Sequence, residues 1–196
     1  MKKTLLEKVK HELLTQGLEM RTAKSRTWLK AKMRQLKGDA VTPILDNPRR
    51  TNLKSRIEIG RMYFYIYDPK TKDTLPYYDI FPLVIPIEPY NDGFLGLNLH
   101  YIDPVSRLNL LDSLYTIATN TNFDARTRLK ISYQLLNSSS KYFQAMPCIK
   151  RYLYSQFESP FLEVPADEWE IAAMLPVAGF VKAKESKVWK DSRKKF

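Results

Sequence analysis

The chain has 196 residues, 44% of them hydrophobic and 12% aromatic, so it is long and apolar enough to bury a core without disulfides. These proportions exclude global disorder, and six scattered glycines without a short repeat exclude a collagen-like chain. The single cysteine, Cys148, excludes an intramolecular disulfide framework and a cysteine zinc site. No apolar run approaches the length of about 20 residues that a membrane helix needs, and Glu7 interrupts the apolar start, so we expect neither a membrane anchor nor a signal peptide.

The net charge of +11 is unevenly distributed along the chain. Residues 1–56 hold 15 Lys or Arg and 5 Asp or Glu, residues 57–181 hold 10 and 14, and residues 182–196 hold 7 and 2. A mildly acidic body over 57–181 is therefore expected between a basic N-terminal arm over 1–56 and a basic C-terminal tail over 182–196. Such asymmetry favours an anionic partner, although basic ends can also be merely solvated.

The N-terminal arm contains two stretches with helical spacing. Apolar residues recur from Leu5 to Leu14 over the first stretch, residues 4–16, and from Trp28 to Leu36 over the second, residues 25–36. Two prolines then predict an extended linker over 42–50. Because few contacts should cross this linker, we expect the arm to reach away from the body, and deletion of residues 1–50 to leave a folded protein.

The first part of the body, residues 57–102, has the composition of a small sheet. The run 57–67 is rich in aromatic and β-branched residues, and further extended segments are predicted over 75–79 and 81–89. Asn91-Asp92-Gly93 predicts a hairpin turn that leads into a return strand over 94–102, in which Gly96 indicates a bulge or a close backbone approach. Short, bent strands of this kind favour a small curled antiparallel sheet or an open β-barrel.

The second part, residues 103–181, is expected to be mainly helical. Helices are predicted from Pro104, over about 124–137, over 148–157 and from Pro165 to Pro176, with a short strand over 161–164 and an extended segment over 179–181. The fold class that follows is α+β: a curled antiparallel sheet or open barrel packed with several helices, forming one body with basic N- and C-terminal arms.

No arrangement of residues points to catalysis. The two histidines, His11 and His100, have no metal-ligand spacing around them, and His100 shares a strand face with Asn98, where a structural role is favoured over ligand binding. Lys150 and Arg151 would lower the pKa of the Cys148 thiol if they approached it, but no histidine is placed to act as its base. We therefore expect a protein that is not an enzyme, with no catalytic residues, no cofactor, no metal and no small-molecule substrate.

Three segments carry a resemblance to a known group of proteins. The sequences 62–70, 75–83 and 93–101 resemble a block in small virion-associated proteins of large contractile-tailed bacteriophages, and the ending 187–195 is similar to the ends of such proteins. The resemblance implies a non-enzymatic structural or assembly role in a virion that is put together in the host cytoplasm. It transfers no catalytic residue and does not indicate neck, tail, baseplate or DNA end.

Two functions are then possible. In the first, the protein is an assembly component that docks on other virion proteins, in several copies of a symmetric particle. In the second, it is a DNA-binding protein that holds or protects the ends of packaged DNA through its basic arms and through strand tyrosines that stack on bases. We favour the first, because a stripe of tyrosines on a strand belongs more often to a core or a protein interface. The residues expected to contact nucleic acid or a partner protein are Arg26, Lys30, Lys32, Arg34, Arg49, Arg50, Lys54, Arg56, Tyr63, Tyr65, Tyr67, Lys187, Trp189, Lys190, Arg193, Lys194 and Lys195.

Overall fold

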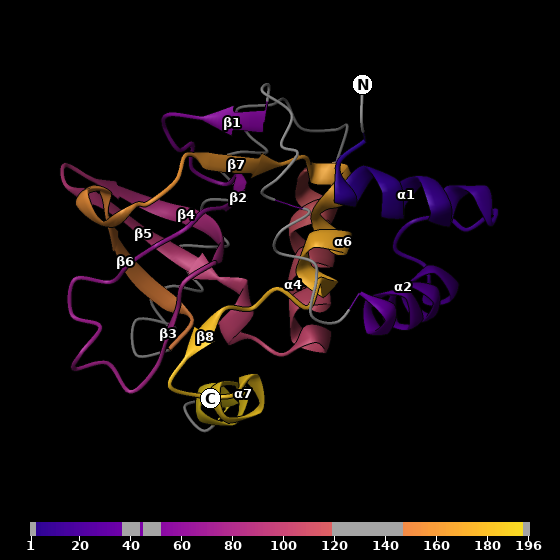
Figure 1. The fold of residues 1–196 in the computed structure, drawn as a ribbon. Helices are drawn as coiled ribbons and strands as arrows, with labels where there is room; N and C mark the ends of the chain where they lie inside the picture. The colour runs from indigo at the N-terminus through magenta and orange to yellow at the C-terminus, as the bar shows by residue number, and fades with distance from the viewer. Residues whose placement is uncertain (1–2, 37–43, 45–51, 119–146, 194–196) are drawn as a thin grey trace.

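A computed structural model of the chain describes residues 3–36, 44, 52–118 and 147–193. Its architecture is α+β, as predicted: an antiparallel sheet of six strands has helices packed beside it, and a two-stranded ribbon lies at one end (Figure 1). The predicted helix over about 124–137 lies outside the described residues. None of the helices in the described ranges is long and apolar enough to cross a membrane.

The main sheet has the strand order β1-β7-β2-β4-β5-β6 and is not closed into a barrel. Its strands are β1 (Leu53–Lys54), β2 (Met62–Phe64), β4 (Leu83–Tyr90), β5 (Gly93–Asn98), β6 (Ile149–Leu153) and β7 (Phe161–Val164). The ribbon pairs β3 (Tyr78–Asp79) with β8 (Phe180–Val181). Strands from both parts of the body therefore share one sheet, and the predicted division into a sheet over 57–102 and a helical part over 103–181 is wrong.

The β4–β5 hairpin is confirmed, and its glycines are explained by packing. A Cβ atom at Gly93 would lie 1.8 Å from the Tyr152 carbonyl oxygen, and one at Gly96 would lie 2.5 Å from the Val84 side chain. Only glycine fits at such distances. The irregularity in the ladder is on β4, where the register shifts between Pro86 and Glu88, opposite the segment that contains Gly96.

Residues 149–153 form β6 rather than the predicted helix. The run from Cys148 to Phe157 fits a helical period, but the backbone of β6 instead pairs with residues Gly93 to Leu97 of β5. Without this partner, the N–H and C=O groups along one edge of β5 would be buried and unsatisfied. The need to hydrogen-bond them outweighs the local helical spacing of residues 148–157.

The helices form layers beside the sheet. In Figure 1, α4 (Pro104–Ala118) and α6 (Trp169–Met174) lie next to the strands, and α1 (Leu5–Thr15) and α2 (Ala23–Gln35) lie outside them. Both predicted N-terminal helices are confirmed, and each begins with a threonine capping box, at Thr4 and Thr22.

These N-terminal helices are not a separate arm. Leu6, Val9, Leu13, Leu29 and Met33 are buried in the same apolar cluster as the sheet and α6. The apolar stripes that were expected to dock on another protein are covered by the chain itself.

The C-terminal tail is also folded onto the body. Helix α7 (Glu185–Arg193) packs against the short turn η2 (Leu99–Tyr101), with Val188 fully buried and Ser192 nearly so. The basic C-terminal tail is therefore fixed to the body as far as residue 193, and its lysines project from a helix in a defined position.

Candidate nucleic-acid interface

A buried polar network centred on Asp79 connects the ribbon, the sheet and η2. Its Oδ2 atom lies 2.7 Å from Nδ1 of His100 and accepts a hydrogen bond from the amide of Asn98 at 3.1 Å. Its Oδ1 atom accepts the backbone N–H groups of Phe81 and Gly179, both at 3.1 Å. A carboxylate with four such contacts is satisfied in the interior, so the network fixes β3 against the body.

The carbonyl oxygen of His100 anchors α7. It accepts hydrogen bonds from the Trp189 indole at 2.9 Å and from the Arg107 guanidinium at 3.1 Å. Burial lowers the pKa of Arg107 to about 10, and two further carbonyl groups, of Ile102 and Ala173, each accept a hydrogen bond from the guanidinium and stabilise its charge. Trp189, expected to contact a partner, is thus bound to the chain's own backbone.

An open cleft of about 280 Å³ lies between the segment 67–79, the end of β5 and β6. Four tyrosines line it, Tyr67, Tyr78, Tyr101 and Tyr152, and we call it the tyrosine cleft. Asp79 and Asn98 from the buried network also line it, and so do three basic residues, Lys70, Lys150 and Arg151. In Figure 1 these strands and the loop that follows β2 lie together at the lower left.

The cations of the tyrosine cleft differ in how far they are already engaged. The Lys150 ammonium lies 4.5 Å from the centre of the Tyr101 ring. The Arg151 guanidinium pairs with Asp92 and lies 4.2 Å from the centre of the Tyr90 ring. Lys70 is exposed and makes no ion pair with any described residue. Lys70 at the mouth is therefore the cation that a ligand in the cleft would meet first, and Lys150 adds positive charge on the Tyr101 wall.

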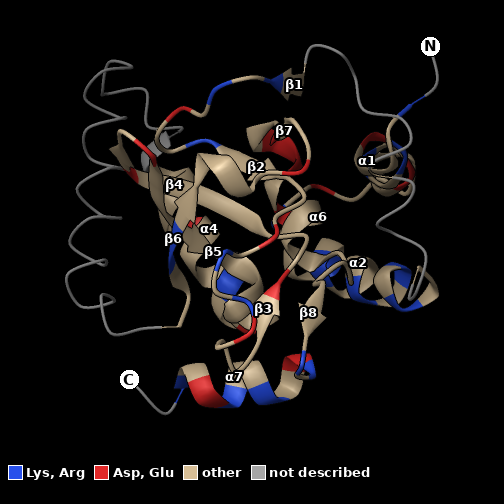
Figure 2. Cartoon of the chain, turned by 60° about the vertical axis from the view of Figure 1, so that its left-hand side comes forward, with Lys and Arg blue, Asp and Glu red and all other residues tan. Residues whose placement is uncertain are grey.

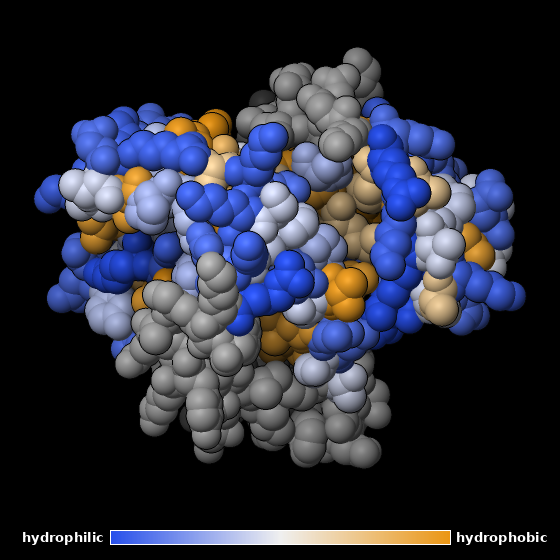
Figure 3. Space-filling view, turned by 90° about the horizontal axis from the view of Figure 1, so that it is seen from below, coloured by the Kyte–Doolittle hydropathy of each residue, from blue (hydrophilic) through white to orange (hydrophobic). Residues whose placement is uncertain are grey.

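Helix α7 presents a second basic surface, beside the first. Lys184, directly before α7, and Lys187 and Lys190 within it are spaced three residues apart, as neighbours on a helix surface are. All three are exposed, and none is paired with a carboxylate among the described residues. We call these residues the α7 lysine row. Figure 2 shows the charged residues along this helix, and Figure 3 shows a largely hydrophilic face on the side where α7 lies, with apolar groups between the charges.

Lys182 connects the α7 lysine row to the tyrosine cleft. Its ammonium donates to the backbone carbonyls of Lys72, Asp73 and Leu75, in the loop that borders the cleft. The loop and the start of α7 are therefore held together, and the two basic surfaces belong to one side of the molecule.

The tyrosines of β2 and its extension are not available to bases. Tyr63, Tyr65 and Tyr67 do share one face, as their alternation predicted, but they are 1%, 1% and 6% exposed. They form an aromatic cluster with residues such as Phe94, Tyr152 and Phe161. The expectation that they stack on nucleic acid is corrected: these rings are core, with Tyr67 reaching the wall of the tyrosine cleft.

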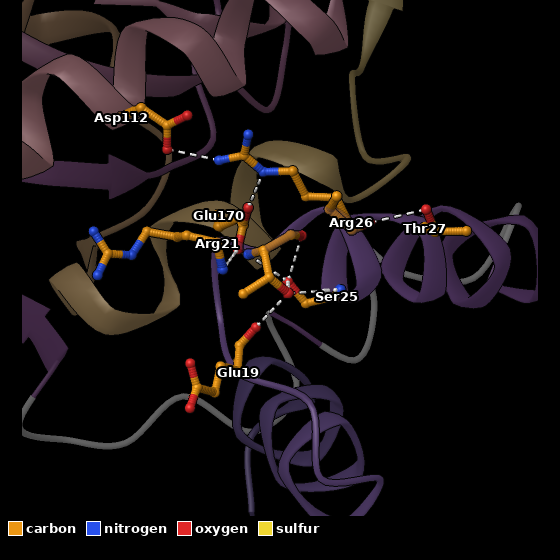
Figure 4. A network of polar contacts seen from close by, with 9 residues as sticks. Glu19, Arg21, Ser25, Arg26, Thr27, Asp112 and Glu170 are labelled. Atoms are coloured by element: carbon orange, nitrogen blue, oxygen red, sulfur yellow. Dashed lines mark hydrogen bonds and ion pairs between the residues drawn. The ribbon is translucent and has the colours of Figure 1, made fainter.

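Arg26 is also structural rather than free for a phosphate. Its guanidinium binds Asp112 and Glu170, both at 2.6 Å, and so ties α2 to α4 and α6 (Figure 4). These carboxylates raise the pKa of Arg26, and the hydrogen bond that Arg26 donates to Asp112 has the largest effect. Glu170 accepts the backbone N–H of Arg21 as well, so the loop between α1 and α2 is fixed at the same point.

The remaining basic candidates are distributed over several faces. Lys32 pairs with Glu12 at 2.5 Å and Lys54 with Glu163 at 3.4 Å. Lys30 and Arg34 are exposed on α2, Arg56 is exposed after β1, and Arg193 is exposed at the end of α7. Arg49, Arg50, Lys194 and Lys195 lie outside the described residues. Among the described candidates, Lys30 and Arg34 are neighbours on α2, and Lys187, Lys190 and Arg193 are neighbours on α7.

Sequence reasoning missed the tyrosine cleft. Its residues come from separated segments, and nothing in the spacing of Lys70, Tyr78, Tyr101 and Lys150 brings them together. Lys150 and Arg151 were noticed only as neighbours of Cys148. Burial raises the pKa of that thiol to about 11 and outweighs the opposite effect of Lys150. Within the described ranges, no three His, Cys, Asp or Glu side chains gather as a metal site requires.

Comparison with known proteins connects the chain with a family of phage proteins. The sequence profile of the family described as phage T4 terminal DNA protecting protein matches residues 3–192. No curated protein and no solved structure matches the chain. The match includes every described helix and strand apart from the last residue of α7, and it supports the expected origin in a tailed phage. The chain belongs to the family of the phage T4 terminal DNA protecting protein.

Proposed function

We propose that this protein binds the ends of linear phage DNA and shields them, in the virion or in the host cell during infection. Its family is described as phage T4 terminal DNA protecting protein. The observation that carries the proposal is the α7 lysine row, three cations without a carboxylate partner in the described residues, on the same side as the tyrosine cleft.

Such a surface suits DNA of any sequence. Lysines that meet phosphates release counterions, and this supplies affinity without reading bases. A protein that must protect an end cannot depend on one base sequence unless all ends share it. Shielding as proposed here is stoichiometric and involves no catalytic step, so the bound DNA remains intact.

The role as an assembly component is less well supported. It rested on apolar stripes in basic arms that seek partner proteins, but Leu13, Leu29 and Val188 are fully buried within this chain. Contacts with other virion proteins would have to use different surfaces. We therefore propose DNA as the principal partner and other virion proteins as neighbours of the bound end.

The proposal is tested by protection of a DNA end from an exonuclease. The substrate is a blunt linear duplex, and the binding control is a duplex of the same sequence closed at both ends by hairpin loops. The protein should slow degradation of the linear duplex and should bind it more tightly than the closed one. Equal affinity for both, or no protection at saturating protein, contradicts the proposal.

A pair of charge-matched variants locates the interface. Lys184, Lys187 and Lys190 are replaced by Gln in one variant, and Lys24, Lys30 and Arg34, exposed on α2, are replaced by Gln in the other. Both lose three positive charges, on helices that lie apart in Figures 1 and 2. Protection should fall in the α7 variant and persist in the α2 variant. The opposite result would place the interface on α2.

A further inference from the structure

We propose that the tyrosine cleft receives the terminal nucleotide of a DNA strand, with the base inside and the 5′-phosphate at the rim beside Lys70 and Lys150. This inference rests on the proposed function and adds to it the part of the DNA that is recognised. It explains how a protein with a general affinity for phosphates distinguishes an end from the interior of a duplex.

The size of the cleft selects a single nucleotide. Its volume of about 280 Å³ lies near the lower limit of pockets that hold small ligands, which suits one nucleotide better than a longer piece of strand. A nucleotide in the middle of a duplex would have to be flipped out of the stack to enter, at a cost of a few kcal/mol. A terminal nucleotide has a stacked neighbour on one side only and is therefore the easiest to unpair.

The charge of the cleft sets the direction of the nucleotide. Asp79 lines the floor, where its position is fixed by His100, Asn98 and two backbone N–H groups. The negative charge of Asp79 repels a phosphate from this part of the cleft, and because its oxygens already have these four partners, the carboxylate fixes the shape of the floor and does not itself bind the base. The phosphate then lies at the rim, where Lys70 and Lys150 supply positive charge.

The phosphate at a 5′ end differs from those along the strand. As a monoester with a second pKa near 6, it carries between one and two negative charges at neutral pH, whereas each internal phosphate carries one. Lys70 at the rim and Lys150 on the Tyr101 wall provide positive charge for this phosphate. The site therefore favours a 5′-phosphorylated end over a 5′-hydroxyl end.

The aromatic walls are rigid enough to hold a base. The Tyr101 ring is packed edge-on against Phe180, with ring centres 5.0 Å apart, and has Lys150 on it. Tyr67 and Tyr152 contact each other at 4.9 Å. Tyr78 is partly exposed at the mouth and presents a ring on which a base can stack, an interaction worth about 1 to 3 kcal/mol per base.

Three duplexes of one sequence test the inference: linear with 5′-phosphates, linear with 5′-hydroxyls, and closed at both ends by hairpin loops. The wild-type protein should bind the phosphorylated duplex about tenfold more tightly than the hydroxyl duplex, the effect expected of one charge-assisted contact. A Lys70→Gln, Lys150→Gln variant should bind both linear duplexes alike and retain wild-type affinity for the closed duplex. Lys72→Gln is the control, because Lys72 lies in the same loop, pairs with Asp68 and does not line the cleft.

The outcomes separate the inference from the proposed function. If the wild-type protein prefers linear to closed DNA but does not distinguish the two kinds of 5′ end, or if the double variant keeps the distinction, the inference is wrong and the proposed function stands. If the wild-type protein does not prefer linear DNA, the proposed function itself fails. If the double variant fails to fold, Lys70→Gln alone is used, because Lys70 is exposed; it should reduce the preference for the 5′-phosphorylated duplex.

Photocrosslinking gives an independent measurement on the unaltered protein. A halogenated pyrimidine is placed at the 5′-terminal position of the duplex or four positions inward. The terminal label should form its adduct with Tyr78 or another residue of the cleft, and the inward label should not. Adducts confined to other surfaces would overturn the assignment.

Discussion

Asp79 shows how one side chain can position both the fold and the candidate site. It belongs to a ribbon of only two-residue strands, which has little stability of its own. Its bonds to His100, Asn98 and Gly179 fix that ribbon to the body, and the same carboxylate lines the tyrosine cleft. The network therefore provides a rigid floor on which the outer tyrosine, Tyr78, is placed.

We predict that Asp79→Ala destabilises the protein by about 3 to 5 kcal/mol, because it leaves the donors around the carboxylate buried without an acceptor. Urea unfolding followed by fluorescence measures the change. Asp73→Ala, an exposed residue in the loop near the cleft, serves as control and should cost less than about 0.5 kcal/mol. A loss below about 1 kcal/mol for Asp79→Ala would show that the network contributes little.

The buried tyrosines predict a loss of stability at alkaline pH. Burial raises the pKa of Tyr65 well above the usual value of 10.0, so the folded protein keeps a proton that the unfolded chain releases. The stabilisation is complete below pH 10 and is lost as the pH rises above it. In Tyr65→Phe the decline of unfolding free energy between pH 9 and pH 11 should be shallower. An unchanged decline would mean that other groups account for it.

At the scale of elements, the helices of the N-terminal region are part of the core. We predict that Leu13→Ala costs about 2 to 5 kcal/mol, since this side chain on α1 is fully buried. Leu14→Ala is the matched control, because Leu14, the next residue on the same helix, is 50% exposed and should tolerate the change. Urea midpoints of the two variants decide between a docked helix and a free arm. If both variants lost little unfolding free energy, the N-terminal helices would be a free arm, and residues 1–50 could be deleted without unfolding the body.

Elements with short-range determinants were predictable from the sequence. Asn91-Asp92-Gly93 specifies its own turn, so the β4–β5 hairpin follows from local residues alone, and the apolar spacing of α1 and α2 placed both helices. What those helices pack against was not predictable, because a buried stripe does not identify its partner. The basic residues around the stripes suggested an outside partner, whereas Arg26 in fact pairs with Asp112 and Glu170 of the same chain.

Elements that depend on distant pairing were not predictable. The segment 149–153 has helical spacing but becomes a strand because β5, more than fifty residues earlier, lacks a partner on that edge. The tyrosine cleft has the same origin, since it exists only once β6 lies beside β5 and the loop 68–75 folds over them. A single sequence contains the residues of the site but not their proximity.

At the scale of the whole molecule, the net charge of +11 is the property most directly connected with DNA. Many of the described cations are neutralised locally, as Lys32 is by Glu12 and Lys54 by Glu163. Total charge therefore overstates the surface that can meet phosphates. The α7 lysine row is a part of the described surface where exposed lysines without an ion pair lie beside the tyrosine cleft, and the dependence of binding on salt can measure its contribution.

We predict that affinity for a linear duplex falls steeply with salt, and that the α7 variant with Lys184, Lys187 and Lys190 changed to Gln has a flatter dependence. Each phosphate contact contributes about −0.9 to the slope of log affinity against log salt concentration, so three lost contacts should reduce the slope by about 2.7. The loss should be the same for unrelated DNA sequences, because phosphate contacts carry no sequence information.

The α2 variant with Lys24, Lys30 and Arg34 changed to Gln has the same net charge and should keep the wild-type slope. Titrations at several salt concentrations give the three slopes. Equal flattening in the two variants would mean that overall charge, and not the α7 lysine row, holds the DNA.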